Sequence, residues 1–260
     1  EGVDVDAATG LGILVSNVPD YCQDEVSDHA ITLILACSRK LLRVVDAVRA
    51  GQWDSLEKPK IRLGLMPPLP RLKGQTLGLV GFGRIARSVA PKAKAFGMRV
   101  IAHDPFVPQA VAQGLDVELV SIDKLLTESD FVSLHAALTP QNYHLINKER
   151  LLKMKKNAYV INTARGGLID EVALVEAIEN GIIAGAALDV TEPEPPRSDS
   201  PLFKTNKIIL SAHTAQYSDE AISDLRRGVE ENVFSVLGGE WPRGLVNPQA
   251  KAKYAKRWGL

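Results

Sequence analysis

A histidine and a glutamate in the last third of the sequence form a combination that suits proton transfer. His213 follows the apolar run KIILSA, and Glu194 lies in the acidic, proline-rich stretch before that run. A neutral imidazole can give or take a proton near pH 7, and a hydrogen-bonded carboxylate fixes its tautomer and favours its protonated form. We interpret His213 as a candidate general acid/base with Glu194 as its partner. The simpler alternative is that Glu192, Glu194 and Asp199 only form a solvated loop.

An arginine in the middle of the chain suits the binding of a carboxylate. Arg165 comes directly after the apolar run AYVINTA and before Gly166 and Gly167. Arginine adds little to stability at such a position, whereas a guanidinium binds a carboxylate through two parallel hydrogen bonds. These residues favour a site for a small acid. An arginine that only ties down a loop is the alternative.

A glycine-rich stretch, TLGLVGFGRIA over 76–86, has the form of a dinucleotide fingerprint. Gly81, Gly83 and Ala86 occupy its three small-residue positions, which allow a tight turn, the approach of a pyrophosphate and close packing of a helix. Asp104 follows the next apolar run, 23 residues after Gly81. A carboxylate there would bind the ribose diol and repel a 2′-phosphate, which favours NAD over NADP. The alternative is a plain glycine turn and a solvated aspartate.

Strand-like and helix-like segments alternate around these residues. Strands are expected at 76–80, 98–102, 116–120, 130–134, 158–162, 182–189 and KIILSA, with helices at 84–96, 107–113, 121–128, 147–154 and 171–179. Asp170 is placed to cap the last of these helices and Gly181 to end it. Such alternation predicts a doubly wound parallel sheet, in which ligands bind beyond the carboxyl ends of the strands. His135, 163–165, 189–194 and His213 are the polar groups at those ends.

The flanking segments are expected to be less regular. Residues 12–18 resemble a strand, 24–50 one long helix, and 52–75 an irregular connection with four prolines. A final helix over 218–237 is expected to bury one apolar face. That face consists of Ile222, Leu225, Val229, Val233 and Val236. The tail 238–260 shows no clear period.

Composition excludes several classes of partner and cofactor. Lys+Arg and Asp+Glu both number 31, so the formal net charge of zero gives no reason to expect a nucleic-acid or membrane partner. Cys22 and Cys37 lack the spacing of metal ligands and read as reduced thiols, so we expect a cytoplasmic protein without a metal. His29, His103 and His144 are interpreted as structural or surface residues.

The chain resembles the D-isomer-specific 2-hydroxyacid dehydrogenases, in the branch that includes C-terminal-binding proteins and phosphoglycerate dehydrogenases. The resemblance extends over about 3–248 and rests on six motifs: NVPDYCQDEVSDHA, TLGLVGFGRIA, LHAALTPQNYHLIN, NTARGGLIDE, GAALDVTEPEPP and SAHTAQYS. It implies a Rossmann cofactor domain with part of a flavodoxin-like substrate domain. The implied division is 1–20 as a remnant of the substrate domain, 21–215 as the NAD-binding domain with a linking helix and dimer arm, and 216–260 as the return to the substrate domain.

The resemblance also implies a reaction and a set of residues. Arg165 would bind a 2-oxo acid, and His213 with Glu194 would protonate it as NADH reduces it to a D-2-hydroxy acid. Arg165, His213 and Gln216 would line the substrate pocket. The cofactor-binding residues would be Gly81, Phe82, Gly83, Arg84, Ile85, Asp104, Ala136, Leu138, Thr139, Asn142, Thr163, Ala164, Arg165, Asp189 and His213.

Three positions depart from the family pattern. Ala86 replaces the last fingerprint glycine without consequence, and Ala137 stands where many members have proline. Gln216 stands where close members often have tryptophan, so we expect an altered substrate pocket. Family members also have a glycine loop that holds the substrate carboxylate, and the sequence begins just after its expected place.

Two functions from different classes are compatible with the sequence. One is an NAD-dependent dehydrogenase; the other is an NAD(H)-sensing protein, similar to the C-terminal-binding corepressors, with little turnover. Intact Arg165, Glu194 and His213 favour the enzyme. The family pattern also implies a homodimer that uses 24–50 and 52–75, and a monomeric mass in solution would contradict it.

Overall fold

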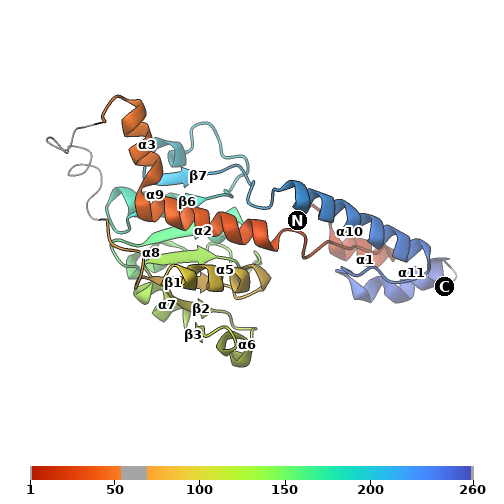
Figure 1. The fold of residues 1–260 in the computed structure, drawn as a ribbon. Coiled ribbons are helices and arrows are strands. Elements are labelled where there is room, and N and C mark those ends of the chain that lie inside the picture. Colours follow the sequence, from red (N-terminus) through yellow and green to blue (C-terminus); the bar gives the residue numbers. More distant parts are fainter. Residues whose placement is uncertain (1, 54–68, 259–260) are drawn as a thin grey trace. The chain divides into compact units, whose positions relative to one another are not determined.

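The computed structural model describes residues 2–53 and 69–258, and Figure 1 shows their ribbon. The chain divides into two compact units. The larger is Asp24–Ala215, and the smaller combines the residues before Asp24 with those from Gln216 onward. Most of the irregular connection expected over 52–75 lies outside the described residues.

The larger unit is built on a sheet of seven strands that pair in parallel among the described residues. Their order is β3-β2-β1-β4-β5-β6-β7, which confirms the predicted doubly wound α/β fold. Three of the inner strands are buried along their whole length, as expected for strands covered on both faces. The strands are β1 (Thr76–Val80), β2 (Arg99–His103), β3 (Glu118–Leu119), β4 (Phe131–Leu134), β5 (Tyr159–Asn162), β6 (Gly185–Leu188) and β7 (Ile208–Leu210).

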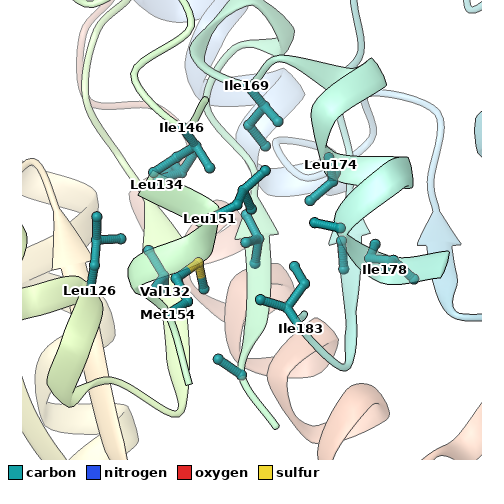
Figure 2. Close-up of a cluster of buried hydrophobic side chains, with 14 of the residues drawn as sticks. Leu126, Val132, Leu134, Ile146, Leu151, Met154, Ile169, Leu174, Ile178 and Ile183 are labelled. Carbon is teal, nitrogen blue, oxygen red and sulfur yellow. The ribbon is translucent and has the colours of Figure 1, made fainter. Parts of the chain in front are cut away.

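Two apolar clusters hold helices against the two faces of this sheet. One cluster joins the strands to α7 (Ile122–Glu128), α8 (Lys148–Lys153) and α9 (Glu171–Glu179), and Figure 2 shows some of its side chains. The other joins them to α2 (Gln23–Arg39), α5 (Arg84–Ala95) and α6 (Gln109–Gln113). Short 3₁₀ turns, η1 (Gly166–Leu168) and η2 (Pro201–Lys204), connect the last strands.

Local sequence accounts for the helix starts around the sheet. The Asp170 carboxylate accepts a hydrogen bond from the Ala173 amide at 3.0 Å, which confirms the predicted cap of α9. Ser121 and Asn147 cap α7 and α8 in the same way. Each such cap satisfies an amide that has no acceptor within its own helix.

The single helix expected over 24–50 is wrong, because it breaks into α2 and α3 (Leu41–Arg49) at Lys40. Lys40 has a left-handed backbone with φ of +50°. Two residues earlier, the Ser38 hydroxyl donates to the Leu35 carbonyl at 3.0 Å. A serine that bonds back to the preceding turn competes with the helical ladder, and apolar periodicity does not register this competition.

The smaller unit consists of helices and extended segments. Its elements are α1 (Val5–Leu11), α10 (Asp219–Leu237), η3 (Pro248–Ala250) and α11 (Lys251–Trp258). The strand expected over 12–18 is wrong, since this segment makes one isolated antiparallel bridge, from Ser16 to Leu245. An apolar run extends readily, but it becomes a strand only where a neighbour pairs along it.

The burial expected along 218–237 is also wrong in part. Val229 and Val233 on α10 are 50% and 52% exposed, and Leu225 is half-buried. They line an open apolar groove with Ile13 and other residues of the same unit. The helical period predicts an apolar face correctly, but the period does not show whether another segment covers that face.

No helix within the described residues is long and apolar enough to cross a membrane.

Substitution of Leu151 tests the first apolar cluster. Leu151 on α8 is 1% exposed and lies inside the cluster that Figure 2 shows. We expect Leu151→Ala to lower the free energy of unfolding by about 2–5 kcal/mol, because it removes buried methyl groups and leaves a cavity. Urea unfolding followed by circular dichroism measures this loss. The control is Leu152→Ala on the same helix, where the side chain is 59% exposed and a loss below about 0.5 kcal/mol is expected.

Candidate active site at the carboxyl edge of the sheet

The register of the strands aligns their carboxyl ends along one edge. Val80 pairs with His103 and with Leu134, and the pairing continues through Asn162 and Leu188 to the end of β7. The residues that follow these strands therefore lie side by side. They are the glycine turn after β1, Asp104, His135, the segment 163–165, Asp189 and the turn that contains His213.

The glycine turn between β1 and α5 has the shape that the fingerprint predicts. Gly81 has φ of +85°, and a methyl group there would lie 2.7 Å from the amide nitrogen of Ala136. Gly83 differs, because a methyl group there would meet nothing within 4 Å. Gly83 precedes α5, whose first-turn amides favour an anion. The space beside Gly83 and the following helix start fit a pyrophosphate.

Asp104 is held directly against this turn. Its Oδ2 accepts a hydrogen bond from the Phe82 amide at 2.8 Å, and its Oδ1 accepts one from the Phe106 amide at 2.8 Å. The adjacent His103 has a structural contact, since its Nδ1 lies 2.9 Å from the Val120 carbonyl oxygen. The position of Asp104 fits a carboxylate that also accepts hydrogen bonds from a ribose.

The two segments beyond β4 and β5 differ in how their polar groups are used. Asn142 organises its own loop, because its Oδ1 accepts from the Thr139 amide and its Nδ2 donates to the Ala137 carbonyl, both at 2.7 Å. Thr163 is 8% exposed, and its Oγ1 is buried without a hydrogen-bond partner among the described residues. A buried hydroxyl without a partner costs free energy. Its position at the strand end fits a polar group of a bound cofactor.

The candidate acid/base pair is formed. His213 Nδ1 lies 2.5 Å from Glu194 Oε1, and the two side chains are 41% and 42% exposed. His213 has φ of +51°, and its amide donates to the Asp189 carbonyl at 2.8 Å. A carboxylate that faces Nδ1 fixes the orientation of the ring and favours its protonated form. Glu194 therefore has a specific contact, which argues against a merely solvated loop.

Arg165 is exposed at the end of β5, where the acidic loop, residues 190–206, passes close by. The Asn162 side chain fixes this turn by donating to the Arg165 carbonyl at 2.9 Å and accepting from the Ala164 amide at 3.0 Å. A methyl group on Gly166 would lie 2.1 Å from the Thr191 carbonyl, so this position requires glycine. The glycine thus allows the acidic loop, which includes Glu194, to pass directly over the arginine turn.

A second contact anchors the acidic loop to α9. The Glu192 amide donates to Glu171 Oε1 at 2.7 Å, and burial raises the pKa of Glu171. The Glu192 carboxylate lies 3.6 Å from His144 Nε2, and the His144 ring stacks on Tyr143. His144 is therefore a structural residue of the loop, as the sequence indicates.

Asp189 was expected beside the cofactor, and its side chain is fully buried. Its carboxylate accepts hydrogen bonds from the Ser211 hydroxyl at 2.6 Å and from the Thr214 and Ala215 amides at 3.0 and 2.9 Å. Ser211 in turn lies 3.1 Å from His29 Nε2. The sequence gives no sign that Ser211 and His29 are linked to Asp189, because no local pattern relates the helix at 23–39 to the strand that ends before Ser211.

Gln216 belongs to the smaller unit, and its place in a substrate pocket stays a prediction. Groups of three or more His, Cys, Asp or Glu side chains able to hold a metal do not occur among the described residues.

Comparison with known proteins identifies the family. The family described as D-isomer specific 2-hydroxyacid dehydrogenase, NAD binding domain, matches residues 31–215. The chain therefore belongs to the D-isomer specific 2-hydroxyacid dehydrogenases and contains their NAD-binding domain, which confirms the resemblance and the expected cofactor.

The individual relatives are named for three different activities. A glyoxylate reductase of Korarchaeum cryptofilum is 41% identical over 96% of this chain and 74% of its own length. A D-3-phosphoglycerate dehydrogenase of Methanocaldococcus jannaschii is also 41% identical, over 100% of this chain but only 49% of its own length. The structure of a D-lactate dehydrogenase from Aquifex aeolicus, complexed with NAD and lactic acid, matches with a TM-score of 0.81 and 31% identity over 92% of this chain and 73% of that one.

The two glycines of the turn provide a matched pair of variants. Gly81→Ala forces a side chain into a left-handed backbone and against Ala136, so we expect a loss of at least about 2 kcal/mol in unfolding free energy. Gly83→Ala should cost about 1 kcal/mol or less but weaken NADH binding at least about tenfold, since its methyl group fills the space for the pyrophosphate. Urea unfolding and NADH fluorescence titration measure the two effects. Normal NADH binding by Gly83→Ala would contradict the fit.

His135 is expected to make the free energy of unfolding depend on pH. Burial lowers its pKa to about 4, although the residue keeps some exposed surface, and Nε2 lies 2.9 Å from Ser133 Oγ. The unfolded chain binds a proton near pH 6.5 while the folded chain does not, so stability is complete above pH 6.5 and falls toward pH 4. We expect a loss of up to about 1 kcal/mol per pH unit. In His135→Gln, unfolding free energies measured from pH 7 to 5 should decline less steeply; an unchanged slope would refute this.

Proposed function

We propose that the chain interconverts small 2-oxo acids and D-2-hydroxy acids with NAD(H). The observation that supports this most directly is the His213–Glu194 pair at 2.5 Å, on the same sheet edge as the dinucleotide turn. An acid/base pair beside a nicotinamide site is what carbonyl reduction requires, because the substrate must receive a hydride and a proton together.

The chain's own groups account for binding and for the movement of the proton. The Arg165 guanidinium binds the substrate carboxylate and polarises the neighbouring carbonyl. Bound NADH supplies the hydride that reduces the keto carbon. His213 Nε2 donates its proton to the carbonyl oxygen, and the Glu194 carboxylate stabilises the imidazolium before transfer and holds its orientation. Oxidation of the hydroxy acid reverses these steps.

We assign the cofactor's parts to the strand ends in order. The pyrophosphate would be bound by the turn and the residues at the start of α5, which are Gly81, Phe82, Gly83, Arg84 and Ile85. Asp104 would bind the ribose. The loop with Ala136, Leu138, Thr139 and Asn142 would lie on the adenosine side. Thr163, Ala164 and Asp189 would line the nicotinamide, with the unpartnered Thr163 hydroxyl as the strongest of these assignments.

The substrate itself is proposed only as a class. The chain spans about three quarters of the glyoxylate reductase and half of the phosphoglycerate dehydrogenase, and the two relatives act on different small acids by their names. We propose that the unit Asp24–Ala215 binds the cofactor, that the smaller unit belongs to the substrate side, and that Gln216 helps to select the acid. The predicted homodimer would use α2 and α3.

Kinetics of site variants test the proposal. NADH oxidation would be followed with glyoxylate, hydroxypyruvate, pyruvate, phenylpyruvate and 3-phosphohydroxypyruvate. We expect His213→Asn to lower kcat about 10²–10⁴-fold with NADH binding nearly unchanged, because only proton transfer is lost. Arg165→Lys should mainly raise KM, since lysine lacks the two-point contact.

A matched control and a clear contradiction complete this test. His144→Asn changes a histidine that also faces a carboxylate, Glu192, yet lies outside the proposed acid/base pair, so kcat should stay within about threefold of the wild type. Equal losses in His144→Asn and His213→Asn would contradict the assignment. NADH binding without turnover of any of these acids would favour the NAD(H)-sensing alternative.

A further inference from the structure

The turn that contains His213 is built around one buried carboxylate. Asp189 receives hydrogen bonds from this segment at both carboxylate oxygens and at its backbone carbonyl. The donors are the Ser211 hydroxyl and the amides of His213, Thr214 and Ala215, at 2.6–3.0 Å. A buried carboxylate is tolerated only when donors surround it, so the burial of Asp189 and the shape of the turn depend on each other.

This turn needs such support because its backbone is strained. His213 has φ of +51°, a left-handed conformation that is unfavourable for a residue with a side chain. The ring is 41% exposed, and its Nδ1 faces Glu194. Strained residues persist where surrounding contacts over-determine them. Here those contacts are the hydrogen bonds to Asp189.

His29 extends this network to a helix on the face of the sheet. Its Nε2 lies 3.1 Å from Ser211 Oγ and 3.6 Å from Asp189 Oδ1. Because the Ser211 hydroxyl donates to Asp189, Ser211 can only accept from His29, which places a proton on His29 Nε2. The next residue, Ala30, is fully buried in the apolar cluster that holds α2, so His29 stands on a rigid element.

We propose that His29 and Ser211 are positioning residues for the proposed reaction: through Asp189 they anchor the His213 turn to α2 and hold the His213 ring toward Glu194. This rests on the proposed function of His213. Neither residue touches the reacting atoms in this scheme. They act by limiting how far the general acid/base can depart from its working orientation, and misplacement of a catalytic group by about 1 Å can cost up to about 100-fold in rate.

Two variants break the network at different points, and one restores it. His29→Leu removes the donor to Ser211, and Ser211→Ala removes the link to Asp189. Each variant should lower kcat about tenfold and change KM less than about threefold. The double variant should lower kcat no further than either single variant, because the two residues act in series. His29→Gln places an amide N–H where Nε2 was and should recover kcat to within about threefold of the wild type. Asp28→Asn, a neighbour on α2 that pairs with Lys92 on the surface, is the matched control and should leave kcat unchanged.

A readout without turnover separates this inference from the proposed function. Hydrogen exchange of the amides of 213–215 should become at least about tenfold faster in His29→Leu and in Ser211→Ala, while exchange in β1 and α2 stays as in the wild type. In Asp28→Asn and His29→Gln, exchange of the turn should stay slow.

Each outcome decides one of the two ideas. Faster hydrogen exchange that is confined to the amides of 213–215, together with a shifted pH profile of kcat/KM, supports the positioning role. A loss of protection from exchange throughout α2 would indicate general destabilisation and would overturn the positioning role. Unchanged exchange at 213–215, or additive losses in the double variant, would also overturn it. If the wild type reduces none of the acids, the proposed function fails, whereas the exchange data still decide whether His29 anchors the turn.

Discussion

The parallel register of the sheet is the constraint on which the rest of the structure depends. Helices cover both faces of the inner strands, and the candidate catalytic and cofactor-binding side chains lie where the strands end. Because Val80, Leu134, Asn162 and Leu188 are aligned by direct pairing, the segments that follow them meet at one edge. The dinucleotide turn and the His213–Glu194 pair come to lie on the same edge of the sheet in this way, although more than a hundred residues separate them in the chain.

Close approach of backbones is the second requirement, and glycine meets it at two points. Gly81 brings the first turn against Ala136, and Gly166 lets the acidic loop pass over the turn of Arg165. At both points a single methyl group would overlap backbone atoms, which cannot move aside as a flexible side chain can. Gly83 is different in kind, since the space beside it is open and fits a ligand.

Three carboxylates at this edge illustrate how surroundings divide one chemical group among different tasks. Asp104 accepts hydrogen bonds from backbone amides at the dinucleotide turn. Asp189 is buried and organises the turn after β7. Glu194 is partly exposed and faces an imidazole, where its charge can stabilise a protonated ring. In the proposed reaction the same functional group would therefore serve cofactor binding, backbone geometry and proton transfer, according to its burial and its donors.

The sequence by itself determined the order of strands and helices, the glycine turn with Asp104, and the pairing of His213 with Glu194, because each depends on local pattern or on the rule that parallel strands end together. Three features were decided only by the tertiary structure. The break at Lys40 depends on a hydroxyl bonding back along its helix, and the exposed face of α10 depends on which segments cover it. The link from His29 through Ser211 to Asp189 joins residues 182 and 22 positions apart, and such a contact exists only after packing has placed α2 beside the end of β7. Local propensity has no information about partners that distant packing supplies.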